Sequence, residues 1–502
     1  MLQINGSARR LCDGVTRREL LQIGSLAPLG LSLSDALQSS AEAAPAARQE
    51  SPAKACILLF LFGSPPQHET FDPKPEAAAE IQGEMGAIST AVPGYQIGEG
   101  LPRIARIADR LTVVRSMTHP FPVHGVAYAL SGMPAYTPAI ESRPRDPQHW
   151  PFMGSVVDWL EGQRHGAGSV GSPEGHVPRN IGLPWKFGSR CTLPTLAGPY
   201  GAFLGSRHDP LWTDFTGKGQ EVAPRLTDGQ TEEVRDPFLQ LAGDGRLQLS
   251  PACQLPEDVA GGRFDARRLL LGQFDQSRRD LERSRQVRSF SASQERAFSL
   301  ITSSRAGEAL DLDREPQSVR DAYGPNLFGQ ACLAARRLVE AGSKFVSVFW
   351  DPFGPFGGSV WDTHANHFPR LKKYLLPVFD QSYTALITDL EERGMLDSTL
   401  VLCTSEHGRT PKIDSKPKGG ARHHWSRAYS SVFAGGGMAA GRIVGQTDAI
   451  AGDVTETPIS PKDMQATAYS LLGYAPETRM PDRTGRPHFI AGDGDVRTEL
   501  LR

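Results

Sequence analysis

A carboxylate, an imidazole and a guanidinium follow directly on an apolar run near position 400. Residues 399–405 are mostly apolar or β-branched without polar alternation, and Glu406, His407 and Arg409 come just after them. Such a run predicts a strand of a parallel sheet that is covered on both faces. Open α/β sheets place their chemistry just past the carboxyl ends of these strands. Glu406 and His407 are therefore candidate ligands of one metal, or an acid–base pair.

Histidines and carboxylates gather in four more segments that adjoin predicted strands. A parallel sheet would bring most of these segments together at one edge. Imidazole nitrogens and carboxylate oxygens are ligands that Zn²⁺ and Mn²⁺ accept. The joint pattern predicts a metal or anion site. The side chains concerned are Glu69, Asp72, His119, His124, Asp362, His364, His423 and His424.

Each histidine taken alone has a simpler structural interpretation. His364 could cap a helix that starts near Asn366. His423 and His424 could be surface residues, one of them packed on Trp425. The prediction of a site therefore rests on the placement of these residues as a group.

The elements that must position these residues alternate between strands and helices. This alternation predicts an α/β sandwich with a mainly parallel sheet. Residues 165–260 are rich in glycine, proline and polar residues without clean periodicity, which predicts an irregular insertion. Pro377 must kink or split the helical segment 367–393. The predicted strands are residues 56–62, 111–117, 345–350, 399–405 and 429–434, and the other predicted helices include 104–110, 126–130, 150–163 and 326–341.

The N-terminal residues 1–44 predict a twin-arginine export signal. An arginine pair at 17–18 precedes a weakly apolar run at 23–33, and small residues at 41–43 offer a cleavage site. We therefore expect a mature protein that begins near Ala44, is exported in its folded state, and acts in the periplasm or outside the cell. No other stretch approaches about 18 uninterrupted apolar residues, so we expect no membrane span after signal removal.

Charge and length narrow the class of protein further. The 54 lysines and arginines nearly balance the 56 aspartates and glutamates, so no global field favours nucleic acid. Six cysteines without CxxC spacing argue against a cysteine-based zinc site. The 502 residues suit one large α/β domain, which we assign to residues 54–490.

Several short motifs, in their order along the chain, resemble a family of exported bacterial proteins. This family is the domain of unknown function fifteen-zero-one of the alkaline phosphatase and sulfatase superfamily. The resemblance implies an alkaline-phosphatase-like three-layer sandwich with a mainly parallel central sheet and helices on both faces. It also implies a hydrolase of phosphate or sulfate esters with two divalent ions, zinc or manganese, and calcium or magnesium as alternatives. The motifs are Thr-Phe-Asp-Pro-Lys-Pro at 70–75, Trp-Asp-Thr-His at 361–364, Gly-Arg-Thr-Pro at 408–411, His-Trp at 424–425 and Ala-Gly-Gly-Gly at 434–437.

The resemblance also implies roles for individual residues. Superfamily members often carry Thr-Ser-Asp-His-Gly at a strand end that binds metal, and residues 404–408 are similar, with Glu406 in place of aspartate. His364 and either His423 or His424 resemble the remaining imidazole ligands. Asp362 would bind the metal or orient His364.

The chain departs from the superfamily pattern in two places. The first strand is followed by Gly63 and Ser64 where a metal-binding aspartate is usual, and Glu69 and Asp72 are the nearby substitutes. Sulfatases carry a cysteine or serine nucleophile before a helix that ends in Leu-Thr-Gly. The helix here ends comparably at Gly132, but no hydroxyl or thiol stands before it. The remaining candidates for the nucleophile are a water molecule activated at the metal site, Thr70, Ser64 and Thr118.

Two classes of function remain open at this point. The first is a hydrolase of a small-molecule or glycan ester, in which Arg409 stabilises transition-state charge and His119 or His124 protonates the leaving group. Arg409 could instead form an ion pair with Asp414 or Glu406. The second class is a non-catalytic binding or scaffold protein on the same fold. The missing nucleophile favours this second class, and the retained Glu406 opposes it.

Overall fold

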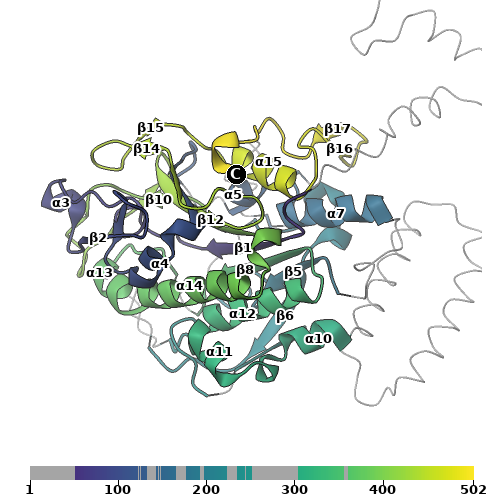
Figure 1. Cartoon of the computed structure of the whole chain (residues 1–502), viewed down its shortest axis with the longest axis horizontal. Helices are drawn as coiled ribbons and strands as arrows, with labels where there is room; N and C mark the ends of the chain where they lie inside the picture. The colour runs from purple at the N-terminus through teal and green to yellow at the C-terminus, as the bar shows by residue number, and fades with distance from the viewer. Residues whose placement is uncertain are drawn as a thin grey trace, which may run out of the picture. The chain divides into compact units, whose positions relative to one another are not determined.

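A nine-stranded sheet lies at the centre of the described fold (Figure 1). The strand order is β13-β4-β12-β9-β1-β8-β5-β6-β7, and β12 and β7 run antiparallel to their neighbours while the others run parallel. The computed structural model describes residues 51–122, 124, 126–132, 143–144, 146, 148–165, 177–192, 197–222, 234–243, 245–250, 304–354 and 360–502. The predicted export signal at 1–44 lies outside these residues. The strands of this sheet are β1 (Ala55–Leu61), β4 (Leu111–Met117), β5 (Asn180–Leu183), β6 (Leu211–Thr216), β7 (Arg246–Leu249), β8 (Phe345–Trp350), β9 (Thr399–Thr404), β12 (Tyr429–Ala434) and β13 (Arg442–Val444).

The central strands are the apolar runs that the sequence predicts. Every residue of β1, β8 and β9 is buried, as expected for strands that are covered on both faces. All five predicted strands are present, each within one residue of its predicted bounds.

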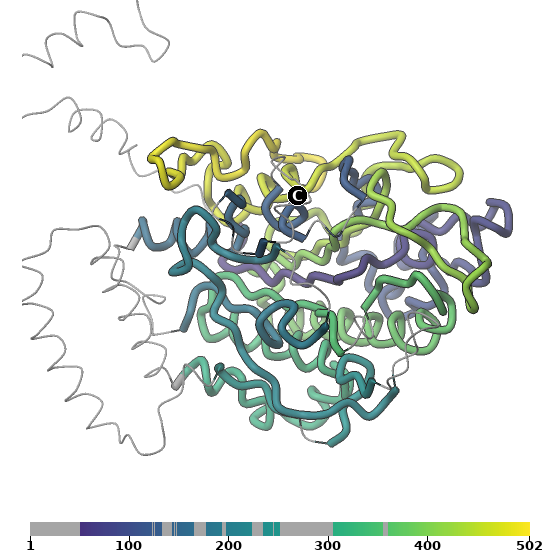
Figure 2. Tube along the Cα trace, turned by 180° about the vertical axis from the view of Figure 1, so that it is seen from behind, coloured from purple at the N-terminus to yellow at the C-terminus, as the bar shows by residue number. Residues whose placement is uncertain are grey.

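Helices cover both faces of this sheet. Because successive side chains of a strand point to opposite faces, Ile57 and Leu59 of β1 enter one core while Leu58 and Phe60 enter the other. Figure 2 shows the same layers from behind. This arrangement confirms the predicted three-layer α/β sandwich. The helices packed in the first core include α4 (Pro102–Arg106), α12 (Leu327–Glu340) and α14 (Leu376–Glu392), and those in the second include α5 (Val126–Ser131), α7 (Met153–His165) and α15 (Pro461–Leu471).

The sequence predicts an irregular insertion at 165–260, but the described part of this segment includes regular strands. Residues of this segment form β5, β6 and β7, which extend the sheet beyond β8. Gly182 of β5 lies against the ring of Trp212 in β6, where a Cβ atom would come within 2.4 Å of the indole. β5 and β7 have only four residues each, too few for a periodicity to stand out, and β6 mixes apolar with polar residues.

The helical segment 367–393 changes helix type just before Pro377 and is not split there, contrary to one of the two predicted outcomes. The chain forms α13 (His367–Arg370), a π-helical turn at Leu371–Leu375, and then α14 with Pro377 in its first turn, where no backbone donor is needed. No helix in the described part of the chain is long and apolar enough to cross a membrane.

Short elements complete the described fold. The pair β10–β11 matters most for the site, because its two strands join Arg409 to His424 directly across the ladder. We call this pair the ribbon. The short elements are α3 (Ala79–Gln82), α10 (Ser304–Leu310), α11 (Gln317–Tyr323), β2 (Ala87–Ser89), β3 (Gln96–Gly98), β10 (Gly408–Arg409), β11 (His424–Trp425), β14 (Gln446–Thr447), β15 (Val454–Glu456), β16 (Arg479–Pro481) and β17 (Pro487–Phe489).

Candidate metal centre

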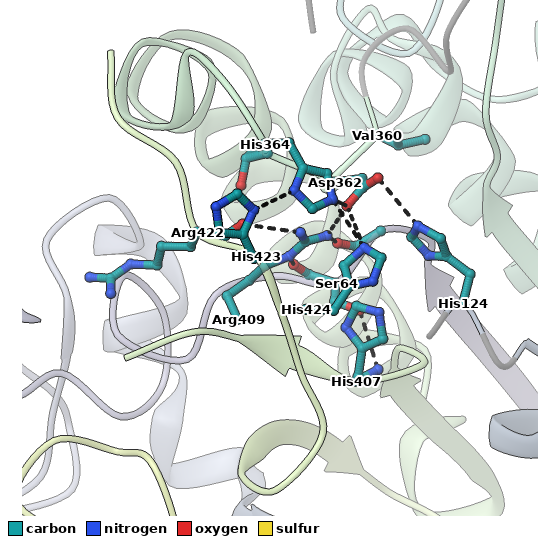
Figure 3. A network of polar contacts seen from close by, with 12 residues as sticks. Ser64, His124, Val360, Asp362, His364, His407, Arg409, Arg422, His423 and His424 are labelled. Atoms are coloured by element: carbon teal, nitrogen blue, oxygen red, sulfur yellow. Dashed lines mark hydrogen bonds and ion pairs between the residues drawn. The ribbon is translucent and has the colours of Figure 1, made fainter. Parts of the chain in front are cut away.

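The carboxyl ends of the parallel strands bring the predicted ligands to one edge of the sheet. β1, β8 and β9 are paired in register up to their last residues, and the first residue of β12 pairs with the last residue of β4. The loops at this edge and the ribbon carry six polar side chains that approach one another. All of them except Glu406 are labelled in Figure 3. We call this set the candidate centre. It consists of His124, Asp362, His364, Glu406, His407 and His424.

A first ligand group within the centre consists of Asp362, His364 and His424. The Asp362 Oδ1 atom lies 2.9 Å from His364 Nε2 and 3.1 Å from His424 Nε2. The two imidazole Nε2 atoms are themselves 3.1 Å apart. All three ligand atoms therefore lie within 4.8 Å of one another, which is the spacing of groups that share one divalent ion.

A second ligand group consists of His124, His407 and His424, whose ligand atoms also lie within 4.8 Å of one another. The His407 Nδ1 atom lies 2.9 Å from the Gly408 carbonyl oxygen, so Nδ1 carries the proton and Nε2 keeps its lone pair. Burial, and then the nearby Arg409, His424 and His124, hold the pKa of His407 well below its usual range. His407 is therefore neutral at physiological pH and ready to act as a ligand.

Two buried polar atoms of the centre have no hydrogen-bond partner among the described residues. They are Glu406 Oε2 and His407 Nε2. A buried polar atom without a partner costs about 1–3 kcal/mol, and a bound cation would remove this cost for any such atom that it contacts. The other oxygen of Glu406, Oε1, accepts a hydrogen bond from Gly63 N–H at 2.8 Å. This arrangement fits a metal ligand held in place by its second oxygen.

His124 lies between two carboxylates. Its Nδ1 atom is 2.9 Å from Glu406 Oε1 and its Nε2 atom is 3.3 Å from Asp362 Oδ2. Burial alone would lower the pKa of His124, but the hydrogen bonds to Asp362 and Glu406 raise it to about 9. The ring also stacks on Phe62, with 5.0 Å between centroids. His124 therefore carries a proton at neutral pH in the arrangement described.

Arg409 is a buried clamp rather than a group open to substrate. Its side chain is fully buried, and Nη2 forms an ion pair with Asp362 Oδ1 at 2.6 Å. The guanidinium also donates to the backbone carbonyls of Gly63, Ser64 and Arg422. Its ionic partner is thus Asp362, which corrects the alternative prediction of Asp414 or Glu406. Burial alone would raise the pKa of Asp362, but Arg409 and the neighbouring histidines hold it well below its usual range.

The turn after β1 takes the place of the usual aspartate. Gly63 has φ +91°, and a Cβ atom there would lie 2.3 Å from the Asp362 amide nitrogen. Ser64 adopts φ +72°, and its hydroxyl oxygen accepts a hydrogen bond from His407 N–H at 3.2 Å. A non-glycine residue in this region of backbone space is uncommon and costs about 1–3 kcal/mol. The turn therefore brings backbone and hydroxyl oxygens, instead of a carboxylate, to the centre.

Glu69 lies outside the centre, which contradicts its predicted role as a metal ligand. Its Oε1 atom accepts hydrogen bonds from Arg422 Nε at 3.0 Å and Nη2 at 2.7 Å, and Oε2 lies 3.4 Å from His367 Nε2. The Arg422 guanidinium points away from the centre in Figure 3. No sequence pattern indicates this pairing, because Arg422 and His367 lie more than 290 positions from Glu69.

Asp72 and the two threonines also have other partners. Asp72 forms ion pairs with Lys74 at 3.0 Å and Arg115 at 3.4 Å. The Thr70 hydroxyl donates to the Pro66 carbonyl at 2.7 Å, which closes a turn. Within the described residues, the Thr118 hydroxyl makes no hydrogen bond to the candidate centre, while its amide donates to Ile459. The structure therefore brings none of these predicted ligands and nucleophiles to the centre.

His119 and His423 flank the centre on its inner and outer sides. Phe121 N–H donates to His119 Nδ1, so the proton lies on Nε2 and is donated to the Glu406 carbonyl at 2.6 Å. Burial lowers the pKa of His119 to about 4, so it supports the strand end as a neutral ring. His423 is exposed, and its Nδ1 atom lies 2.9 Å from His364 Nδ1.

The model of a family described as "Protein of unknown function (DUF1501)" matches residues 53–501. The chain belongs to this family. The match agrees with the resemblance carried by the short motifs. Among curated proteins, none matches the chain.

Solved structures similar to this chain include two hydrolases of the alkaline phosphatase-like superfamily. The PsFucS1 sulfatase from Pseudoalteromonas sp. is 14% identical, with a TM-score of 0.35, over 89% of this chain and 73% of that one. The phosphonate monoester hydrolase SpPMH from Silicibacter pomeroyi is 12% identical, with a TM-score of 0.35, over 89% and 76%. Ps i-CgsB is 12% identical, with a TM-score of 0.39, over 88% and 75%. Because these identities and TM-scores are low, the similarity does not establish an activity for this chain.

Proposed function

We propose that the protein is an exported, divalent-metal-dependent hydrolase of phosphate or sulfate esters. The observation that carries this proposal is the pair of buried, unpartnered ligand atoms, Glu406 Oε2 and His407 Nε2, beside the first ligand group. Such atoms are costly to bury unless a ligand satisfies them. The predicted export signal supports action in the periplasm or outside the cell, on a small-molecule or glycan ester.

The donor set favours zinc or manganese. Asp362, His364 and His424 would hold one ion. His407 of the second ligand group would hold a second ion together with Glu406, whereas a protonated His124 has no lone pair to offer as a ligand. Since a neutral imidazole has one free lone pair, His424 can serve only one of the two groups at a time. Calcium and magnesium prefer oxygen ligands, so sites this rich in imidazole suit them less. Bound ions would neutralise charge on the ester oxygens and activate the attacking group.

We assign the proton of the leaving group to His124. This ring holds a proton between Glu406 and Asp362, both of which are candidate ligands. Cations held by these carboxylates would offset their charge and bring the pKa of His124 down from about 9 towards neutrality. A general acid works best with a pKa near the operating pH. His119 is less suited, because burial lowers its pKa to about 4 and leaves the ring without the second proton that it would have to give.

We assign the attack on the ester to water. Thr70 and Thr118 make no hydrogen bond to the candidate centre among the described residues, and the Ser64 hydroxyl is completely buried against the His407 amide. Arg409 acts through Asp362, which it holds at 2.6 Å, rather than on the ester itself.

The proposal is tested by hydrolysis of 4-nitrophenyl phosphate and 4-nitrophenyl sulfate. The mature protein would be stripped with a chelator and assayed before and after addition of zinc or manganese. We expect turnover of one ester that depends on the metal and is lost in His424→Ala. His488→Ala is a matched control, because His488 contacts Asp482 in the β16–β17 hairpin rather than the centre. Absence of turnover of both esters under every metal condition would favour the non-catalytic binding protein.

A further inference from the structure

A groove of about 1390 Å³ lies beside the candidate centre. Its walls come from three segments that are far apart in the sequence: residues 73–81, residues 410–416 and residues 449–453. Trp425 of the ribbon also lines it. Ligand sites for drug-sized molecules usually measure about 300–1,000 Å³, so this groove has room for a body larger than one aromatic ring.

The lining of the groove is mostly apolar. Pro73, Ile81, Ile413, Trp425 and Ile450 contribute apolar surface to it. The Trp425 indole N–H is already bonded to the Gly452 carbonyl at 2.6 Å, which leaves the ring itself for contact. Ile450 is 41% exposed, although large apolar side chains of the described residues are rarely exposed to this degree. Exposed apolar surface that is gathered in a concave site indicates a binding site.

The charges around the groove cancel. Four cationic and four anionic residues line it, and several pair with each other across the rim. Lys412 lies 3.3 Å from Glu80, and Arg427 lies 2.5 Å from Asp453. A site for a polyanion, such as a heavily sulfated glycan, would carry an excess of positive charge. The lining therefore favours a neutral occupant. The eight residues are Lys74, Lys412, Lys416, Arg427, Glu76, Glu80, Asp414 and Asp453.

The groove adjoins the candidate centre at His423. This residue lines the groove, and its ring stacks on that of His364 with 5.1 Å between centroids. His424 joins the centre from the same short segment, while Trp425, the next residue, lines the groove. Residues 423–425 therefore contribute to both sites.

We propose that this groove binds the neutral, apolar alcohol portion of the ester substrate. The anionic ester group would then lie at the candidate centre, on the far side of His423. The assignment of the bound alcohol to an ester substrate rests on the proposed function. The binding of an apolar alcohol in the groove does not.

The test measures binding of biphenyl-4-ol, a neutral alcohol that has no ester to hydrolyse. Ile450→Glu places a charge in the groove at an exposed position, and Ile450→Leu keeps the position apolar. Phe489→Glu is the matched control, because Phe489 is 43% exposed but lies in β17, away from the residues that line the groove. We expect saturable binding that weakens about tenfold or more in Ile450→Glu and stays within about twofold in the other two variants.

Two results would overturn the proposal. One is equal binding of biphenyl-4-ol by Ile450→Glu and the wild type. The other is tighter binding of dextran sulfate than of the alcohol, lost in Ile450→Glu, which would make the groove a glycan site. Because the alcohol is not a substrate, failure of the hydrolase proposal would appear separately, as normal alcohol binding without turnover of any ester.

Discussion

Replacing Glu69 by glutamine should destabilise the fold by about 3 kcal/mol. Both partners of the Glu69–Arg422 pair are fully buried, and Arg422 donates two hydrogen bonds to one carboxylate oxygen. Breaking a buried pair leaves an uncompensated charge and costs about 3–5 kcal/mol. Glutamine still offers an oxygen to Arg422, so we expect the lower end of this range.

The shift in the pKa of Glu69 corresponds to a similar loss of stability. Burial alone would raise this pKa, but Arg422, and then His367, lower it to about 2 from an ordinary value of 4.5. A difference of this size corresponds to about 3 kcal/mol of stability. Because the folded-state pKa is depressed, this stability is fully present above about pH 4.5 and is lost as the pH falls towards 2.

Urea denaturation from pH 7 to pH 3 measures both effects. Glu69→Gln should lower the free energy of unfolding by a constant amount above about pH 5, and the gap to the wild type should narrow below that. Glu391→Gln is a matched control, because its ion pair with Arg110 is exposed and should contribute less than about 1 kcal/mol. A loss in Glu69→Gln no larger than in this control would refute the argument.

Three further predictions concern the surroundings of the centre and the buried carboxyl group of Asp351. Burial raises the pKa of Asp351 to about 8, despite hydrogen bonds from Trp185 and Gly188. The stability of the wild type should therefore fall as the pH rises from about 4 through 8. Urea midpoints measured at pH 5 and pH 9 should show this fall in the wild type and not in Asp351→Asn. Arg409→Lys keeps the charge but loses the fork that holds Asp362, so zinc affinity by isothermal titration should fall about 10–100-fold while the circular dichroism spectrum is unchanged. Gly63→Ala puts a methyl group against the Asp362 backbone and should lower both the Tm and zinc binding, whereas retained zinc affinity would contradict the close approach.

The strands could be predicted from the sequence because they are buried on both faces. β1, β8 and β9 appear as uninterrupted apolar runs, and their bounds follow from where these runs end. The strands at the far edge could not be recognised. β5 has only four residues, with a glycine that makes room for a tryptophan of β6, and β6 mixes apolar with polar residues, so neither forms an uninterrupted apolar run.

The convergence of the candidate ligands could be predicted where a strand ends in a histidine or a carboxylate. Parallel strands meet at one edge, so Asp362, His364, His407 and His424 converge as expected. The role of Glu69 could not be predicted, because its partner Arg422 approaches only through the tertiary fold. A buried carboxylate near a strand end has the same sequence pattern whether it binds a metal or an arginine.

The metal content of the folded mature protein tests the central claim most directly. Mass spectrometry would measure zinc and manganese after purification without a metal-affinity tag, with His407→Ala and the control His488→Ala beside the wild type. We predict about two equivalents of zinc or manganese in the wild type and in the control, and about half of this in His407→Ala. Absence of bound metal in the wild type, even after incubation with zinc or manganese, would contradict the metal centre and leave a binding protein on this fold.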